Sequence, residues 1–200
     1  MKRAMITVKQ GDITVKVPAD TVATTFISAA LAQIGTPSCA VKNHDLPALG
    51  EYWPGEGGHY AGVIRGENGQ PDYHLIVAAG PAAEFKAKWG GYEHETPGAK
   101  SPGNGMANTK AMLADSENHP AATAAAKFTA DGHADFYLPA RRELQVAEAN
   151  VPELFSKAYH WSSTQRSANG AFSMGFGDGC QGNVAKRSEW LVRPVRRILI

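Results

Sequence analysis

The chain has 200 residues, of which 43% are hydrophobic and 20% are charged, and its formal net charge is +1. This composition can form a hydrophobic core and excludes a chain that is disordered throughout. Basic residues are dispersed except for Arg193, Arg196 and Arg197, so the sequence offers no continuous basic stripe for nucleic-acid phosphates. We therefore expect no nucleic acid among the partners of this protein.

Residues 1–48 are predicted to form a hairpin, a helix and a linker. Apolar side chains alternate in residues 4–8 and 13–17, on either side of a Gly-Asp turn, which indicates two paired strands. A capped helix is expected over residues 20–34, ended by Gly35. Its apolar face is thin, and a hairpin with one such helix cannot form a stable core alone. We expect this segment to mediate attachment or oligomerisation, and the protein to be a homo-oligomer.

From residue 49 to residue 200 the sequence predicts one domain of short helices and strands. The expected elements are strands 60–65 and 73–79 as a hairpin, helices at 120–129 and from Pro139 onward, a turn at Pro152, and strands 160–164, 171–176 and 190–198. Pro139 is expected at the first helical position, with Leu144, Val146 and Ala147 facing inward. The Gly-rich stretch 90–108 has no assignable pattern.

Five short motifs follow one another in the second half of the chain. They are residues 107–109 (ANT), 119–122 (HPAA), 136–144 (FYLPARREL), 160–164 (HWSST) and 190–196 (WLVRPVR). Their order and spacing resemble C-type-lectin-fold families, including the C-terminal domain of bacterial collagen-like adhesins of the Lcl type. These families share their fold with sulfatase-modifying enzymes and with the variable proteins of retroelements. Phe136 with Tyr137, and His160, depart from the usual aromatic residues of the pattern.

The resemblance implies an α+β fold: a C-type-lectin-like domain with a small mixed or antiparallel sheet and two or three short helices. Leu138, Leu144, Trp161 and Trp190 are large apolar residues within the motifs, and we expect them to be mostly buried.

Two arginines of the last motif, Arg193 and Arg196, are three positions apart. On one continuous strand they would lie on opposite faces, so at most one should point inward. We expect the inward one to bind loop carbonyls or Glu143.

Motifs of catalysis and metal binding are weak in this sequence. The glycines of residues 177–182 spell a dinucleotide fingerprint, but no helix is predicted after them. Residues 70–72 (QPD) match a calcium tripeptide of lectins but lie at a predicted hairpin tip, and the seven histidines lack the spacing of metal ligands. Cys39 and Cys180 are the only thiols, and both are expected to be reduced. We expect no enzyme activity, no cofactor and no metal.

The predicted contact surface lies in residues 165–189, between two motifs that we expect to be rigid strands. Gly and Asn permit tight turns there, and polar, cationic and amphipathic side chains suited to recognition stand among them. The candidate ligand-binding residues are Gln165, Arg166, Asn169, Phe172, Met174, Asp178, Gln181, Asn183, Lys186 and Arg187.

These features predict a binding module that recognises a host surface protein or a glycan. The N-terminus carries no apolar core of signal-peptide length, and the apolar-leaning run 22–34 is too short to span a bilayer. A phage virion component fits this combination: a tail tip or fibre protein, joined to other virion subunits through residues 1–48. The alternatives are an enzyme on the sulfatase-modifying fold and a purely structural virion subunit.

Overall fold

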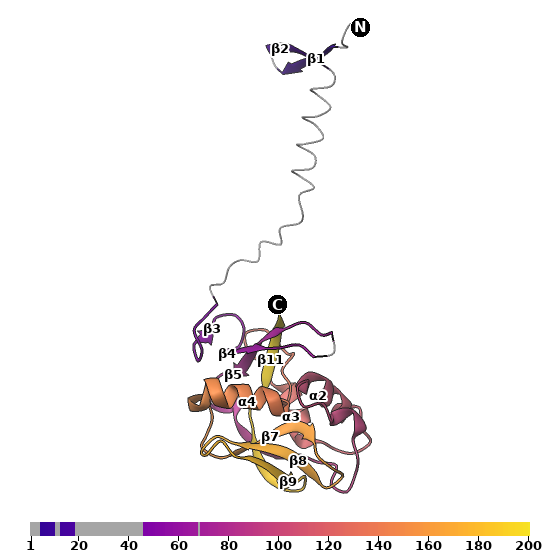
Figure 1. Cartoon of the computed structure of the whole chain (residues 1–200), viewed down its shortest axis with the longest axis vertical. Coiled ribbons are helices and arrows are strands. Elements are labelled where there is room, and N and C mark those ends of the chain that lie inside the picture. Colours follow the sequence, from indigo (N-terminus) through magenta and orange to yellow (C-terminus); the bar gives the residue numbers. More distant parts are fainter. Residues whose placement is uncertain (1–4, 11–12, 19–45, 68) are drawn as a thin grey trace. The chain divides into compact units, whose positions relative to one another are not determined.

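A computed structural model describes residues 5–10, 13–18, 46–67 and 69–200 (Figure 1). The chain divides into two compact units, Met1–Leu46 and Pro47–Ile200, next to the boundary expected after residue 48. The helix expected over residues 20–34 lies outside the described residues. In the described part of the chain, no helix is long and apolar enough to cross a membrane.

The first unit contains the predicted N-terminal hairpin. Strand β1 (Met5–Gln10) pairs antiparallel with β2 (Ile13–Pro18), and Val8 lies opposite Val15. The alternation of apolar residues on the two strands therefore predicted both the strands and their pairing correctly.

The second unit has an α+β architecture with two sheets, which confirms the predicted class. One sheet has the strand order β11-β5-β4-β3 and the other has the order β6-β10-β7-β8-β9. The strands are β3 (Tyr52–Trp53), β4 (Gly58–Ile64), β5 (Tyr73–Ala78), β6 (Phe85–Lys88), β7 (Tyr159–Gln165), β8 (Gly170–Gly175), β9 (Gln181–Ala185), β10 (Glu189–Val192) and β11 (Val195–Leu199). The helices are α2 (Gly105–Leu113), α3 (Pro120–Lys127) and α4 (Arg141–Asn150), with short 3-10 turns at Pro81–Ala83, Pro97–Ala99 and Pro152–Leu154.

The main hydrophobic core lies where α4 packs between the two sheets (Figure 1). Leu144 and Ala147 of α4 pack with Leu75 of β5 on one side and with Met174 of β8 on the other. A second core forms around Trp161, which is completely buried among residues of α2, α3 and β10. Because α4 contributes to the contact between the sheets, its start and orientation decide where the strands on both sides lie.

The start of α4 is held by the buried carboxylate of Glu143. Its Oε2 accepts a hydrogen bond from Ala140 N at 2.6 Å, and its Oε1 accepts from the hydroxyls of Tyr73 and Tyr137 at 2.7 and 2.8 Å. Burial raises the pKa of Glu143, whereas these three donors act in the opposite direction. The carboxylate thus joins α4 to β5 and to the segment that carries Tyr137.

Two details of the α4 start follow from this contact. Ala140 is the residue that caps the helix and Arg141 is its first residue, so the prediction that Pro139 occupies the first helical position is wrong by two residues. The approach of α2 is also close, because a Cβ on Gly105 would lie 2.4 Å from Glu143 Oε2. Only glycine fits at this first position of α2.

The expected terminal strand 190–198 is in fact two strands in different sheets. β10 pairs with β6 and β7, whereas β11 pairs with β5. Pro194 lies between them, and proline cannot donate a backbone N–H to a sheet. The prediction of one continuous strand was therefore wrong.

The break also overturns the prediction that only one of Arg193 and Arg196 points inward. Both are buried. Arg193 donates to the carbonyl of Ala78 from Nε at 3.1 Å and from Nη2 at 2.9 Å, which is the kind of partner that we expected. Arg196 is held by Asp135, 2.9 Å from its Nε, and by the carboxylate of Glu56.

The expected burial of the motif residues is confirmed for three of four. Leu138, Leu144 and Trp161 are buried, but Trp190 is only half-buried. Trp190 lies on β10 and contacts Tyr159 edge to face, near the margin of the second core.

This difference predicts unequal costs for the two tryptophans. Trp161→Ala should lower the free energy of unfolding by about 3–5 kcal/mol, because the indole is completely buried. It should also lose the hydrogen bond from Nε1 to the carbonyl of Ala87. Chemical denaturation of the two alanine variants measures this, with Trp190→Ala as the matched control. An equal or smaller loss in Trp161→Ala than in Trp190→Ala would contradict the assignment of the core.

Candidate functional site

The predicted contact residues do not form one surface, because most of residues 165–189 belongs to strands. β8 and β9 run antiparallel, with Gly170 opposite Ala185 at one end and Met174 opposite Gln181 at the other. Four residue steps along a strand span roughly 14 Å. Candidates next to the 165–170 turn are therefore separated by the length of the hairpin from Asp178 at the opposite end.

Three of the ten candidates are not available to a ligand, which corrects the predicted site. Gln165 and Met174 are buried and Lys186 is completely buried. Met174 packs in the main core. Arg166, Asn169, Asp178, Gln181, Asn183 and Arg187 are exposed, and Phe172 is half-buried.

Lys186 and Gln165 form a polar network beneath the surface. Lys186 Nζ donates to Gln165 Oε1 and to the carbonyl of His94, both at 2.7 Å, and lies 4.6 Å from the ring centroid of Trp89. Gln165 Oε1 also accepts from Thr96 N at 2.9 Å. The two side chains therefore hold the loop around residues 91–96 against the sheet that contains β7 and β9. The sequence showed that both side chains are polar but not that they are buried.

Two half-buried and two exposed side chains lie together on one face of the β8–β9 hairpin. The guanidinium of Arg141, the first residue of α4, lies 4.8 Å from the ring centroid of Phe172. Asn183 is directly opposite Phe172, and Gln181 is two residues away on the same face of β9. We refer to Arg141, Phe172, Gln181 and Asn183 as the β8–β9 patch. Sequence reasoning missed Arg141, since only the fold brings α4 over β8.

The position of Arg141 is set by backbone contacts. Its N–H donates to Thr164 Oγ1 at 3.0 Å, so the first turn of α4 is tied to β7. Its Nε is buried and has no hydrogen-bond partner among the described residues. The patch therefore combines a cation, an aromatic ring and two amides on rigid elements.

A second cationic group lies just beyond the end of β9, next to the 165–170 turn. Arg187 is 4.8 Å from the ring centroid of Tyr92, and its Nη1 donates to the hydroxyl of Tyr92 at 3.3 Å. The turn that carries Arg166 and Asn169 is adjacent, because Lys186 N donates to the carbonyl of Asn169 at 3.0 Å.

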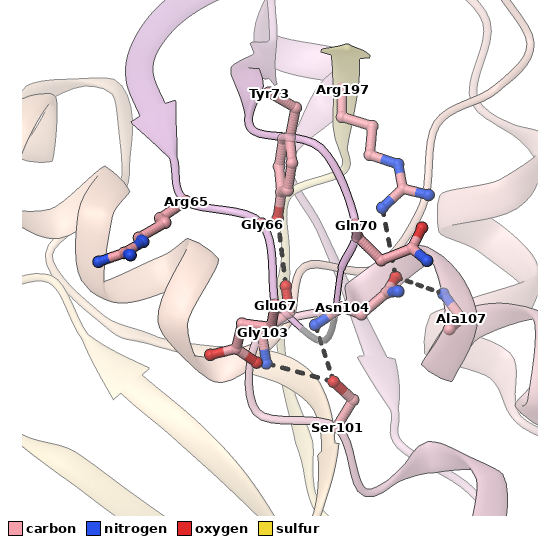
Figure 2. Close-up of a pocket in the computed structure, with 10 residues that line it drawn as sticks. All are labelled: Arg65, Gly66, Glu67, Gln70, Tyr73, Ser101, Gly103, Asn104, Ala107 and Arg197. Carbon is pink, nitrogen blue, oxygen red and sulfur yellow. Dashed lines mark hydrogen bonds between the residues drawn. The ribbon is translucent and has the colours of Figure 1, made fainter. Parts of the chain in front are cut away.

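A pocket of about 290 Å³ opens between the β4–β5 loop and the start of α2 (Figure 2). Arg197 of β11 reaches into it, with its guanidinium 5.5 Å from the ring centroid of Tyr73 and Nη1 3.5 Å from Asn104 Oδ1. Asn104 also caps α2, because its Oδ1 accepts from Ala107 N at 3.0 Å. Its own backbone N–H donates to Ser101 Oγ at 3.0 Å. Gly-rich residues 90–108, which the sequence left unassigned, provide this wall of the pocket.

Ser156, His160 and Glu84 are residue types found in catalytic triads, but they are not arranged as a triad. Ser156 Oγ and His160 Nε2 both bind the carboxylate of Glu84, His160 at 2.7 Å, so the carboxylate lies between the hydroxyl and the imidazole. A hydroxyl nucleophile needs direct contact with its base. Burial lowers the pKa of His160. These residues tie the end of the 152–158 segment to the start of β6.

The described part of the chain gathers no cluster of metal-ligating side chains and contains one thiol, that of Cys180. No group of three or more His, Cys, Asp or Glu side chains there could hold a metal ion. Cys180 is exposed, and a hydrogen bond to Asp178 raises the pKa of its thiol, which makes it a weak nucleophile at neutral pH. Cys39 lies outside the described residues.

Comparison with protein-family models and with curated proteins found no match to this chain. Any assignment to a family therefore depends on the sequence motifs and on the fold itself.

The buried Lys186 predicts a specific pH dependence of stability. Burial lowers the pKa of Lys186 from 10.5 to about 8, so between these values the unfolded chain binds more protons at this group than the folded chain. The contribution of Lys186 to the free energy of unfolding should therefore rise as the pH rises from 8 to 10.5. Denaturation of the parent and of Lys186→Met across this range measures it. The free energy of unfolding of the parent minus that of Lys186→Met should increase with pH. A constant difference would contradict the burial of the charge.

Proposed function

We propose that residues 49–200 form a C-type-lectin-like binding domain that recognises a host surface protein or glycan as part of a phage tail tip or fibre. The five ordered sequence motifs and the α+β architecture support this proposal. So does the position of the last strand, β11, which pairs with the early strand β5, as expected of a domain whose two ends lie side by side.

The observation that carries the proposal is the β8–β9 patch. Arginine and aromatic side chains supply much of the binding energy at protein interfaces, and a guanidinium over a ring is already arranged for contact. Phe172 is half-buried, so the fold limits its motion before a ligand arrives, and the amides of Asn183 and Gln181 can both donate and accept hydrogen bonds. Strands hold all but Arg141, which lies at the fixed start of α4.

Recognition is favoured over the sulfatase-modifying alternative by chemistry. An enzyme needs a cleft with convergent ionisable groups. Of the four patch residues only Arg141 is ionisable, and Cys180 lies exposed at the opposite end of the hairpin from the 165–170 turn. A purely structural subunit, the third possibility, would bind no component of a host surface.

Substitution of the patch tests the proposal. Full-length protein carrying Phe172→Ala with Asn183→Ala should bind immobilised bacterial surface fractions and glycans at least about tenfold more weakly than the parent, since both central contacts are lost. Phe85→Ala is the matched control, because Phe85 is also half-buried but lies on β6. Surface plasmon resonance measures the binding, and thermal unfolding confirms that the variants are folded.

Two results would contradict the proposal. One is that the parent binds no surface fraction and no glycan, as expected of a structural subunit. The other is that the patch variant binds as tightly as Phe85→Ala.

The N-terminal unit is proposed to attach the domain to copies of itself or to other virion subunits. A two-stranded hairpin such as β1–β2 is marginally stable alone and gains stability from pairing with further surfaces.

Deletion of residues 1–46 tests this role. The full chain should be an oligomer in light scattering, and the deleted protein should be a folded monomer, because the second unit has its own cores. Circular dichroism verifies that it is folded. The same number of subunits before and after deletion would count against an attachment role.

A further inference from the structure

Arg197 differs from the two other arginines near the end of the chain. Arg193 and Arg196 are buried against carbonyl and carboxylate partners. Arg197 is half-buried and lies over the ring of Tyr73, yet within the described ranges no carboxylate lies within 4.0 Å of it. A guanidinium has five N–H donors, and the contact of Arg197 with Asn104 Oδ1, at 3.5 Å, is at the limit of a hydrogen bond. Most of its donors therefore face the pocket.

The rest of the pocket adds groups that bind hydroxyls. Figure 2 shows the polar ends of Arg197, Gln70 and Asn104 directed toward one part of the pocket. Ser101 contributes a hydroxyl nearby. Amides and hydroxyls can both donate and accept, so they suit a ligand with several hydroxyl groups.

Negative charge near the pocket is already compensated. Glu67 lines the wall but forms an ion pair with Arg142 of α4. Glu143 lies beneath Tyr73 and accepts hydrogen bonds from three neutral donors, and the nearby charge of Arg197 lowers its pKa. The guanidinium of Arg197 also lies with the polar ends of Gln70 and Asn104 in one part of the pocket.

We infer that this pocket binds a small hydroxylated carboxylate, with Arg197 holding the carboxylate and Gln70, Asn104 and Ser101 contacting the hydroxyls. A planar guanidinium binds a carboxylate through two parallel hydrogen bonds, which a point charge cannot reproduce. A volume of about 290 Å³ is at the lower end for ligand pockets and suits a molecule of monosaccharide size. The site is separate from the β8–β9 patch, and the inference does not depend on the function proposed above.

The ligand class has two sources, an acidic sugar and an open-chain hydroxy acid. Isothermal titration of the full-length protein with glucuronate, gluconate and glucose distinguishes them, because the three probes share the hydroxyls at C2, C3 and C4 but glucose has no carboxylate. At least one of the two carboxylates should bind about tenfold or more tightly than glucose, and the tighter one identifies the source.

Two variants locate the binding. Asn104→Asp retains the cap of α2, since aspartate is as good a capping residue as asparagine, but it places a carboxylate against Arg197. It should weaken carboxylate binding by about tenfold or more, because the guanidinium is then occupied. Lys110→Gln is the matched control and should leave the affinity within about twofold, since Lys110 is exposed on α2 and is not among the residues that line the pocket, so its charge is screened by solvent.

Arg197→Lys provides a further readout, since it retains the charge but not the planar fork. It should also weaken binding, and its melting temperature shows whether the loss reflects unfolding. Three results would overturn the inference: no binding of either carboxylate, equal binding of glucose, or full carboxylate affinity in Asn104→Asp.

Discussion

The carboxylate of Glu143 has no exposure to solvent and accepts hydrogen bonds from Ala140 N and from the hydroxyls of Tyr73 and Tyr137. A buried carboxylate is costly unless such donors surround it, and here each donor comes from a different part of the fold. Tyr73 begins β5, Tyr137 bridges to Val195 of β11, and Ala140 caps α4. The requirement to satisfy one carboxylate thus connects the first sheet to the helix that separates it from the second.

Both proposed binding regions depend on this connection. Because Glu143 sets where α4 begins, it also sets where Arg141 lies over Phe172 and where Arg142 meets Glu67. On the other side, Tyr73 supports the guanidinium of Arg197. The β8–β9 patch and the Arg197 pocket therefore extend outward from the same buried group, which gives each a rigid support.

The sequence predicted elements with strong local patterns and missed features made by distant contacts. Alternating apolar residues located the first hairpin, the turn-rich residues 66–72 located the second, and an Ala-rich run located α3. α2 has little amphipathic character, and its local signal was the capping Asn104; the alternation of Phe85 and Ala87 in β6 was visible but short. The burial of Lys186 could not be predicted locally, because its carbonyl partners are more than 90 residues away. The contact between Phe172 and Arg141 could not be predicted locally either, because Arg141 belongs to α4 and Phe172 to β8.

Glu143→Gln tests the central claim most directly. Glutamine has nearly the same shape but only one accepting oxygen. If that oxygen accepts from the two tyrosines, the NH₂ group of the glutamine faces the N–H of Ala140. In the reverse orientation, the tyrosines have no acceptor. The free energy of unfolding, measured by chemical denaturation at neutral pH, should fall by about 1–3 kcal/mol or more because a buried donor loses its partner. Stability within about 0.5 kcal/mol of the parent would contradict the claim that this carboxylate holds the fold together.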